Sequence, residues 1–235
     1  MAEDKKKGKI GRPKKEKDPT QEQKKKKRGR PRKTEEKPEA VESVKKKVRK
    51  LNDEQISKYV DEIAGPSRKN RQSAAAKLAA QKEINLDALQ PYIPDFIDAL
   101  NRPEARTRWE CLDILSEFCK AGKANKCQKA IDGAEAALFD EYNGTLRLSA
   151  LQFLCAYGAT TSTRADSVWP LIDDAIQCYH GDMEFRNMLV AIVSFSTGNI
   201  SKEVKKELKE RMAFDAEFSE GPLKRRAATI VKNCK

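Results

Sequence analysis

The sequence predicts an all-α protein in which about five helical hairpins stack into a solenoid that follows a basic tail. Two observations predict this organisation. Apolar residues recur in a helical pattern at a nearly constant interval of 37 to 39 residues throughout residues 51–235. Residues 1–50 hold 22 basic and 9 acidic residues, whereas the rest of the chain holds 26 basic and 27 acidic residues. We therefore expect two domains, 1–50 and 51–235.

The tail, residues 1–50, has too few apolar residues to form a core. It contains seven of them and no aromatic residue, and the first aromatic residue of the chain is Tyr59. Such a segment cannot bury enough apolar surface to offset the entropy lost on ordering. We expect the tail to be disordered on its own.

Residues 27–33 of the tail read Lys-Arg-Gly-Arg-Pro-Arg-Lys. Gly29 lacks a Cβ, so the backbone can lie against the floor of a narrow groove, and Pro31 holds Arg30 extended. The core of this segment resembles the AT-hook of high-mobility-group A chromatin proteins. The resemblance implies binding in the minor groove of A/T-rich double-stranded DNA, which is narrow and strongly negative. The residues assigned to this DNA contact are Arg28, Gly29, Arg30, Pro31, Arg32 and Lys33.

A second copy of the motif lies upstream at Gly11, Arg12, Pro13 and Lys14. Ile10 stands where the other copy has an arginine, so we expect a weaker half-hook that adds avidity on the same duplex. Lysine-rich tails also serve as import signals, as solubilising segments or as RNA-binding segments. These alternatives stay open.

The repeat in residues 51–235 is anchored on a basic residue followed by apolar or small residues at +3, +4 and +7, which is one face of an α-helix. The anchors are Arg71, Arg108, Arg147, Arg186 and Lys224. Leu112, Leu151 and Val190 share the +4 position, so we expect all three to be buried.

Each anchored helix is expected to begin four residues before its anchor, where residues suited to a helix start occur. These starts are Ser67, Glu104, Asn143, Asp182 and Glu220. A second amphipathic segment lies between successive anchors. Pro94 is expected to kink the one that spans residues 86–100.

Two helices per unit of about 38 residues resemble HEAT repeats. The resemblance includes the Arg-x-x-Ala stretch at residues 71–74 and 147–150, and it covers nearly all of residues 51–235. It implies a right-handed solenoid with atypical repeats at both ends. The sequence departs from the pattern at the ends, where the opening helix near residues 51–63 is thin and the last anchor is Lys224.

The anchor arginines allow two interpretations. They can form a ladder of phosphate ligands, or each can join one repeat to the next by binding a carboxylate or a carbonyl. Each anchor lies near the centre of its apolar face, which favours the second interpretation. The nearly neutral body also argues against a nucleic-acid cradle along its whole length.

A candidate partner site lies on the side of the anchored helices at +1 and +5. Trp109 beside Leu148 would be unusual on a surface without a partner. We therefore hypothesise a protein-binding groove on the concave face that includes Trp109, Asp113, Leu148 and Asn187. The alternative is that Trp109 packs against its neighbouring repeat.

No sequence pattern for catalysis is present. The chain has no glycine-rich phosphate loop, one histidine (His180) and six cysteines without a C-x-x-C pair. We expect no cofactor, no metal and reduced, buried thiols. Some HEAT-like solenoids are DNA glycosylases that use aromatic residues and a carboxylate. Trp109 and Asp113 form superficially such a pair, but a near-neutral body lacks the basic surface that those enzymes need.

The sequence thus predicts a non-enzymatic, DNA-associated adaptor. Its tail ties the solenoid to A/T-rich DNA, and the solenoid presents a surface to an unidentified protein partner. The alternative is a protein-binding scaffold whose tail is only a targeting or solubility segment. No stretch approaches the about 18 apolar residues of a membrane span, and no apolar signal core follows Met1. We expect an intracellular protein, in the nucleus or in the nucleoid according to the organism.

Overall fold

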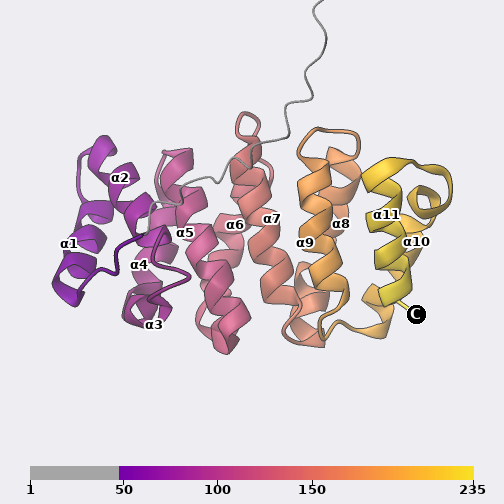
Figure 1. Cartoon of the computed structure of the whole chain (residues 1–235), viewed down its shortest axis with the longest axis horizontal. Coiled ribbons are helices and arrows are strands. Elements are labelled where there is room, and N and C mark those ends of the chain that lie inside the picture. The colour runs from indigo at the N-terminus through magenta and orange to yellow at the C-terminus, as the bar shows by residue number, and fades with distance from the viewer. Residues whose placement is uncertain (1–47) are drawn as a thin grey trace, which may run out of the picture. The chain divides into compact units, whose positions relative to one another are not determined.

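The structure, a computed structural model, describes residues 48–235, and within them the chain folds into helices and connecting turns without strands. The helices pair in chain order into five hairpins (Figure 1). The first helices of the hairpins are α1 (Asp53–Ala64), the short α3 (Leu86–Leu89) with α4 (Ile93–Asp98), α6 (Ile131–Leu138), α8 (Ser162–Tyr179) and α10 (Lys202–Phe218). The second helices are α2 (Arg68–Ala79), α5 (Ala105–Phe118), α7 (Gly144–Gly158), α9 (Phe185–Ser196) and α11 (Gly221–Asn233).

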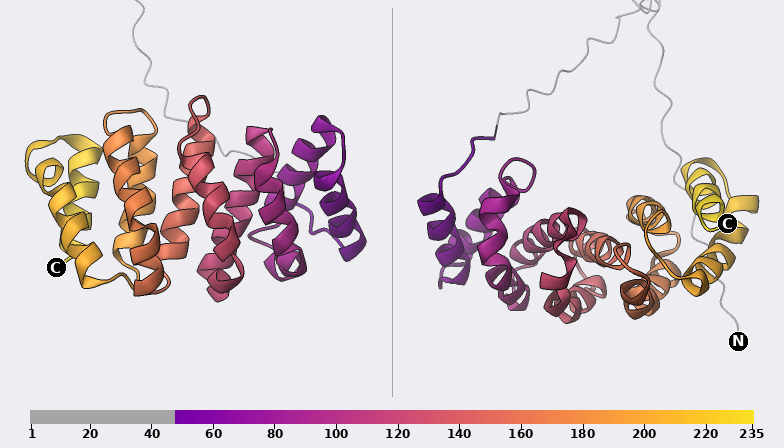
Figure 2. Two further views of the ribbon diagram at one scale, coloured as in Figure 1. Left: turned by 180° about the vertical axis from the view of Figure 1, so that it is seen from behind. Right: turned by 90° about the horizontal axis from the view of Figure 1, so that it is seen from below.

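The described residues form a two-layered helical solenoid, as the repeat pattern predicts. The second helices of neighbouring hairpins pack closely on one another, whereas the first helices make few backbone contacts between hairpins. Closer packing on one side curves the stack. Figure 2 (right) shows the resulting shallow arc with the second helices on its inner side. A single apolar core runs between the two layers.

The predicted helix starts are confirmed for four of the five second helices. Ser67, Glu104, Asn143 and Glu220 each immediately precede their helix, and the Ser67 side chain accepts a hydrogen bond from the backbone of Asn70. The fourth start is wrong, because α9 begins at Phe185 instead of just after Asp182.

The segment before α5 is broken, as its proline predicts. Residues 86–101 form two short α-helices and two 3₁₀ turns, with Pro91 and Pro94 each near the start of a piece. A proline lacks the N–H that would continue the preceding turn. The second hairpin therefore has a compact, irregular first element.

The expected burial is confirmed for two of the three +4 residues. Leu112 and Leu151 are buried, but Val190 is 51% exposed. The buried residues of α9 include Phe185, Met188, Leu189 and Ile192, which have the repeat spacing but begin one residue earlier than the set anchored on Arg186. Phe185 thus occupies the place of the anchor, and Arg186 is exposed.

Arg71, the first anchor, ties the first hairpin to the second. Its guanidinium donates to both carboxylate oxygens of Glu104, the residue that precedes α5, and to the carbonyl of Gly65 at 2.8 Å. Arg71 and Glu104 are both buried. The hydrogen bonds from Arg71 hold the pKa of the Glu104 carboxyl below its usual value.

The next two anchors act in the same way. Arg108 on α5 lies 3.8 Å from the carboxylate of Asp140, and Arg147 on α7 lies 3.4 Å from that of Glu184, the residue that precedes α9. The interpretation of the anchors as links between repeats is therefore confirmed for these three, which do not form a ladder of free phosphate ligands. It is wrong for Arg186, which is exposed, and for Lys224, which donates to the carbonyl of Glu217 within its own hairpin.

Candidate functional site

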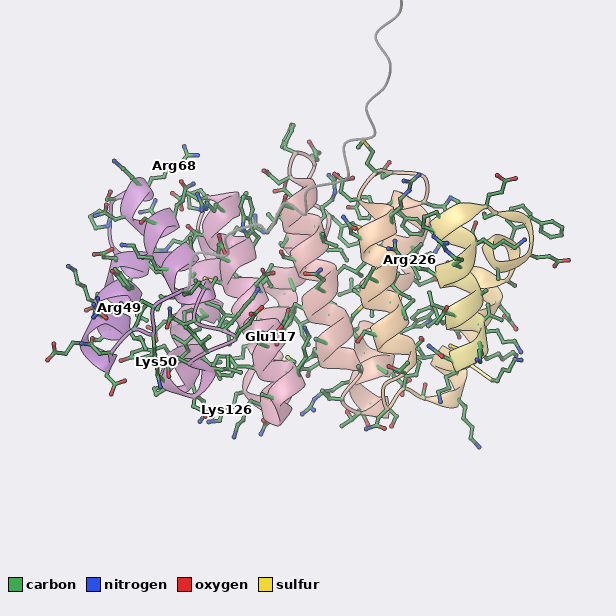
Figure 3. The ribbon with its side chains drawn as sticks, viewed as in Figure 1. Arg49, Lys50, Arg68, Glu117, Lys126 and Arg226 are labelled. Carbon is green, nitrogen blue, oxygen red and sulfur yellow. The ribbon has the colours of Figure 1, made fainter. Side chains whose placement is uncertain are left out.

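The candidate site is the inner face, defined as the exposed side of the second helices α2, α5, α7, α9 and α11. In Figure 1 this layer lies nearer the viewer. Figure 3 labels two of its residues on the visible side, Glu117 from α5 and Arg226 from α11. Side chains on these helices that point away from both the first helices and the neighbouring hairpins meet solvent here.

The four predicted partner-site residues differ in how far they are exposed to solvent. Trp109 and Leu148 are partly buried and pack against the core, whereas Asn187 is exposed. Position +1 lies only about 100° around the helix from the anchor, which keeps Trp109 and Leu148 near the apolar side of their helices, against the core. The packing interpretation of Trp109 thus holds in large part.

Asp113 is engaged within the protein. Its carboxylate lies 3.0 Å from the ammonium of Lys82, a residue of the segment that follows α2. Because the carboxylate of Asp113 is paired with Lys82, it is not free to act in catalysis beside Trp109. The structure therefore gives no support to the glycosylase alternative.

A hollow of about 520 Å³ lies on the inner face between α7, α9 and the end of α5. Its lining is formed by small or uncharged side chains and one lysine, among them Gln152, Ala156, Val190, Ala191, Ser194 and Lys120. The sequence does not indicate this hollow, because small residues carry no chemical signal. The exposure of Val190 is explained by its position at this edge.

Charges on the inner face are paired around α5. Glu110 lies 3.6 Å from Arg106, and Glu117 lies 2.8 Å from Lys120. Together with the link between Asp113 and Lys82, these pairs leave the region around α5 without an excess of either sign.

The end of the inner face formed by α9 and α11 carries basic residues. Arg225 and Lys232 are exposed on α11, and Arg186 is exposed on α9. Arg226 donates to the backbone carbonyl of Arg186, which joins the two helices. In the part of the chain that the structure describes, none of these four side chains forms a salt bridge. Arg186, Arg225, Arg226 and Lys232 are named the basic end here.

The two layers of the solenoid have opposite charge. The first helices carry 17 acidic and 7 basic residues, whereas the second helices carry 12 basic and 3 acidic residues. The three acidic residues of the second helices all lie on α5. The near-neutral charge of residues 51–235 therefore conceals a basic inner layer and an acidic outer layer.

The predicted DNA-contacting residues of both tail motifs lie outside the described residues. The described chain begins on the inner side of the arc, at the indigo end in Figure 2 (right). There Gln81, which is buried, donates to the carbonyl of Arg49 at 3.1 Å and accepts from the backbone of Leu51 at 3.0 Å. Residues 49–51 are thus fixed to the loop after α2.

The structure pairs none of the six cysteines, and the expected burial fails at Cys178. Five of the six cysteines are buried and Cys178 is exposed. Burial raises the pKa of the Cys111 and Cys155 thiols. The described residues contain no group of three or more His, Cys, Asp or Glu residues placed to hold a metal ion. None of their helices is long and apolar enough to cross a membrane.

Comparison of the chain with known proteins identifies the fold. No model of a known protein family matches the chain, and no curated protein matches it in sequence. Among solved structures, a designed armadillo repeat protein in complex with the peptide (KR)4 has a TM-score of 0.63 at 12% identity, with 78% of this chain and 87% of that chain covered.

Two further structures give the same result. An engineered protein has a TM-score of 0.63 at 11% identity, with 76% of this chain and 78% of that chain covered. Designed armadillo repeat proteins for modular peptide recognition have a TM-score of 0.60 at 14% identity, with 76% and 81% covered. These similarities establish an armadillo- or HEAT-like helical-repeat solenoid.

Proposed function

We propose that this protein is a non-enzymatic scaffold whose inner face binds an extended segment of a protein partner. The observation that supports the proposal is the hollow between α7 and α9. It opens on the curved side of the stack and is lined by small side chains that leave room for a ligand side chain. A concave, largely uncharged recess with polar groups around it is typical of a binding site.

The similar structures support the same function. One of them was solved with a bound peptide, and another was designed for modular peptide recognition. The peptide in that complex is basic, whereas the inner layer of this chain is itself basic. The binding mode can therefore be shared while the ligand differs.

We further propose that the tail ties this scaffold to A/T-rich DNA through its two motifs. The support is the Arg-Gly-Arg-Pro core at residues 28–31 and the copy at residues 11–14. Within this function the solenoid is an adaptor that brings a protein partner to DNA.

The scaffold function is tested by selecting binders from a library of twelve-residue peptides with the full chain. We expect the selected peptides to bind in the hollow. Val190→Trp fills the hollow without a change of charge and should weaken their binding at least tenfold. Ile84→Trp is the matched control, because Ile84 is a similarly exposed apolar residue (45%) away from the hollow. Equal binding by both variants would disprove the site.

The DNA function is tested by titrating the full chain with A/T-rich and G/C-rich duplexes at physiological salt. We expect a preference for the A/T-rich duplex that Arg28→Ala with Arg30→Ala removes, because these arginines enter the groove. Replacement of Lys25 and Lys26 by alanine should instead lower the affinity for both duplexes to the same extent, since phosphate contacts carry no sequence information. An unmodified chain without A/T preference would disprove the groove contact and leave targeting, solubility or RNA binding as the role of the tail.

A further inference from the structure

We infer that the segment bound by the inner face is acidic, with an apolar side chain in the hollow and carboxylates on the basic end. The inference rests on the proposed function, because it names the chemistry of the partner at the same site. Its occupant is an extended stretch of a partner protein rich in Asp and Glu.

The first step concerns the hollow. The side chains contributed by α7 and α9 are uncharged, and Lys120 at the end of α5 is the charged member of the lining. A ligand carboxylate would lose its water there, and the ammonium of Lys120 already lies 2.8 Å from the carboxylate of Glu117. The hollow therefore suits an apolar ligand side chain of moderate size.

The second step concerns the basic end. Arg225 and Lys232 are seven residues apart, which places them on the same side of α11 about 10 Å apart along its axis. Neither is neutralised by a salt bridge within the described residues, and the adjacent Arg186 and Arg226 add to the same field. Unpaired cations on one face attract a ligand of opposite charge and fix its register.

The third step concerns the distance between the two features. Helices α9 and α11 lie side by side along their length, since Arg226 bonds to Arg186 near one end and Asn233 bonds to Ser196 at 2.9 Å near the other. Packed helices lie about 8–10 Å apart, and an extended chain advances about 3.3 Å per residue. A ligand whose apolar residue fills the hollow thus reaches α11 within about three to five residues.

Other occupants fit less well. The tail of the same chain carries a large excess of basic residues, so it has the same sign as the basic end. A DNA duplex running along the inner face would cross the region around α5, whose ion pairs leave no excess of positive charge, and it has no side chain to place in the hollow. An acidic peptide can occupy the hollow and the basic end without crossing α5.

The experiment uses the full chain and a fluorescent twelve-residue peptide with one leucine followed, after three residues, by a run of Asp and Glu. Because the basic tail can also attract this probe, the comparison is made between variants that leave the tail unchanged. Arg225→Glu with Lys232→Glu reverses two charges at the basic end. The matched control is Lys58→Glu with Lys129→Glu, which reverses two exposed charges away from the inner face.

We expect the charge reversal at the basic end to lower the affinity for the acidic probe at least tenfold. The control reversal should change this affinity by less than twofold. A probe with Lys in place of Asp and Glu should bind the reversed variant better than the unmodified chain. Replacing the leucine of the probe by serine should weaken binding about fivefold. Unchanged thermal unfolding of both variants, which alter exposed residues, shows that the fold is retained.

Three outcomes would overturn the inference. Equal binding of the acidic probe to both variants would show that the tail holds it. Loss of duplex DNA affinity in the reversed variant, with probe affinity unchanged, would assign the basic end to DNA. Library peptides that depend on the hollow but are not acidic would leave the proposed scaffold function standing and refute the acidic partner. Failure to select any peptide dependent on the hollow would refute the proposed function itself.

Discussion

At the scale of single residues, the buried pair of Arg71 and Glu104 links stability to pH. Arg71 donates hydrogen bonds that favour the ionised carboxylate, so the pKa of Glu104 is lower in the folded protein than in the unfolded chain. A lowered folded pKa contributes stability that is fully present above the unfolded value of about 4.3 and is lost as the pH falls through the folded pKa.

The prediction concerns Glu104→Gln, which keeps the shape of the side chain and removes its charge. At pH 7 we expect the midpoint of thermal unfolding to fall by several degrees, because the buried Arg71 loses its counter-ion. The difference in the free energy of unfolding between the variant and the unmodified protein should be constant above about pH 5 and should shrink below about pH 4. Urea unfolding across this pH range measures it. Glu135→Gln, at an exposed position of α6, is the control, and a difference independent of pH would contradict the assignment.

A second prediction at this scale concerns the thiols. A thiol must be exposed and ionised to react, and burial opposes both conditions. We expect one thiol of the native protein to react rapidly with a disulfide reagent at pH 7.5 and this reaction to disappear in Cys178→Ser. The buried thiols should react only at the rate of unfolding. A second rapid thiol that disappears in Cys119→Ser or Cys155→Ser would show that the hollow admits the reagent to these residues, which line it.

At the scale of elements, the sequence predicted five hairpins and placed four of the second helices correctly. Their apolar pattern is interrupted by polar residues, so only one register buries the apolar face. Helix α9 is different, because its sequence is apolar almost all round (Phe-Arg-Asn-Met-Leu-Val-Ala-Ile-Val-Ser-Phe-Ser). The repeat spacing of +3, +4 and +7 fits two starting points equally well. Counted from Arg186 it selects Leu189, Val190 and Val193, and counted from Phe185 it selects Met188, Leu189 and Ile192. Periodicity alone cannot choose between two such registers.

The register of α9 is tested by truncating two adjacent residues. Leu189→Ala should lower the free energy of unfolding by about 2–5 kcal/mol, since it opens a cavity in the core. Val190→Ala should change it by less than about 0.5 kcal/mol, as at other surface positions. Urea unfolding of the two variants gives the comparison. The reverse order of the two effects would restore the register anchored on Arg186.

The binding site was less predictable than the helices. Trp109 drew attention because it is large and apolar, yet it is partly buried and packs against the core. The hollow is formed by Ala156, Ala191 and Ser194, whose significance arises only when three helices are stacked. A sum of charges over each expected helix, instead of over the whole domain, would have indicated the basic inner layer.

At the scale of the whole molecule, the proposed adaptor binds two anionic ligands with one basic chain. The described chain starts beside α2, whereas the hollow and the basic end lie between α7 and α11. At about 8–10 Å between packed helices, roughly 30 Å separates the start of the body from the partner site. That distance is several times the Debye length of about 8 Å at physiological salt. A duplex held near the start of the body would therefore not repel a peptide at the partner site, and in that arrangement we expect the two ligands to bind independently.

Independent binding is measured by titrating the acidic probe into the full chain with and without a saturating A/T-rich duplex. We expect the affinity for the probe to change by less than about twofold, since screened charges interact weakly beyond a Debye length. Native mass spectrometry should then detect a complex of protein, duplex and peptide. Arg28→Ala with Arg30→Ala should remove the duplex from this complex and keep the peptide, whereas Arg225→Glu with Lys232→Glu should do the opposite. Mutual exclusion of the two ligands would mean that both compete for the tail, and the chain would then not act as an adaptor.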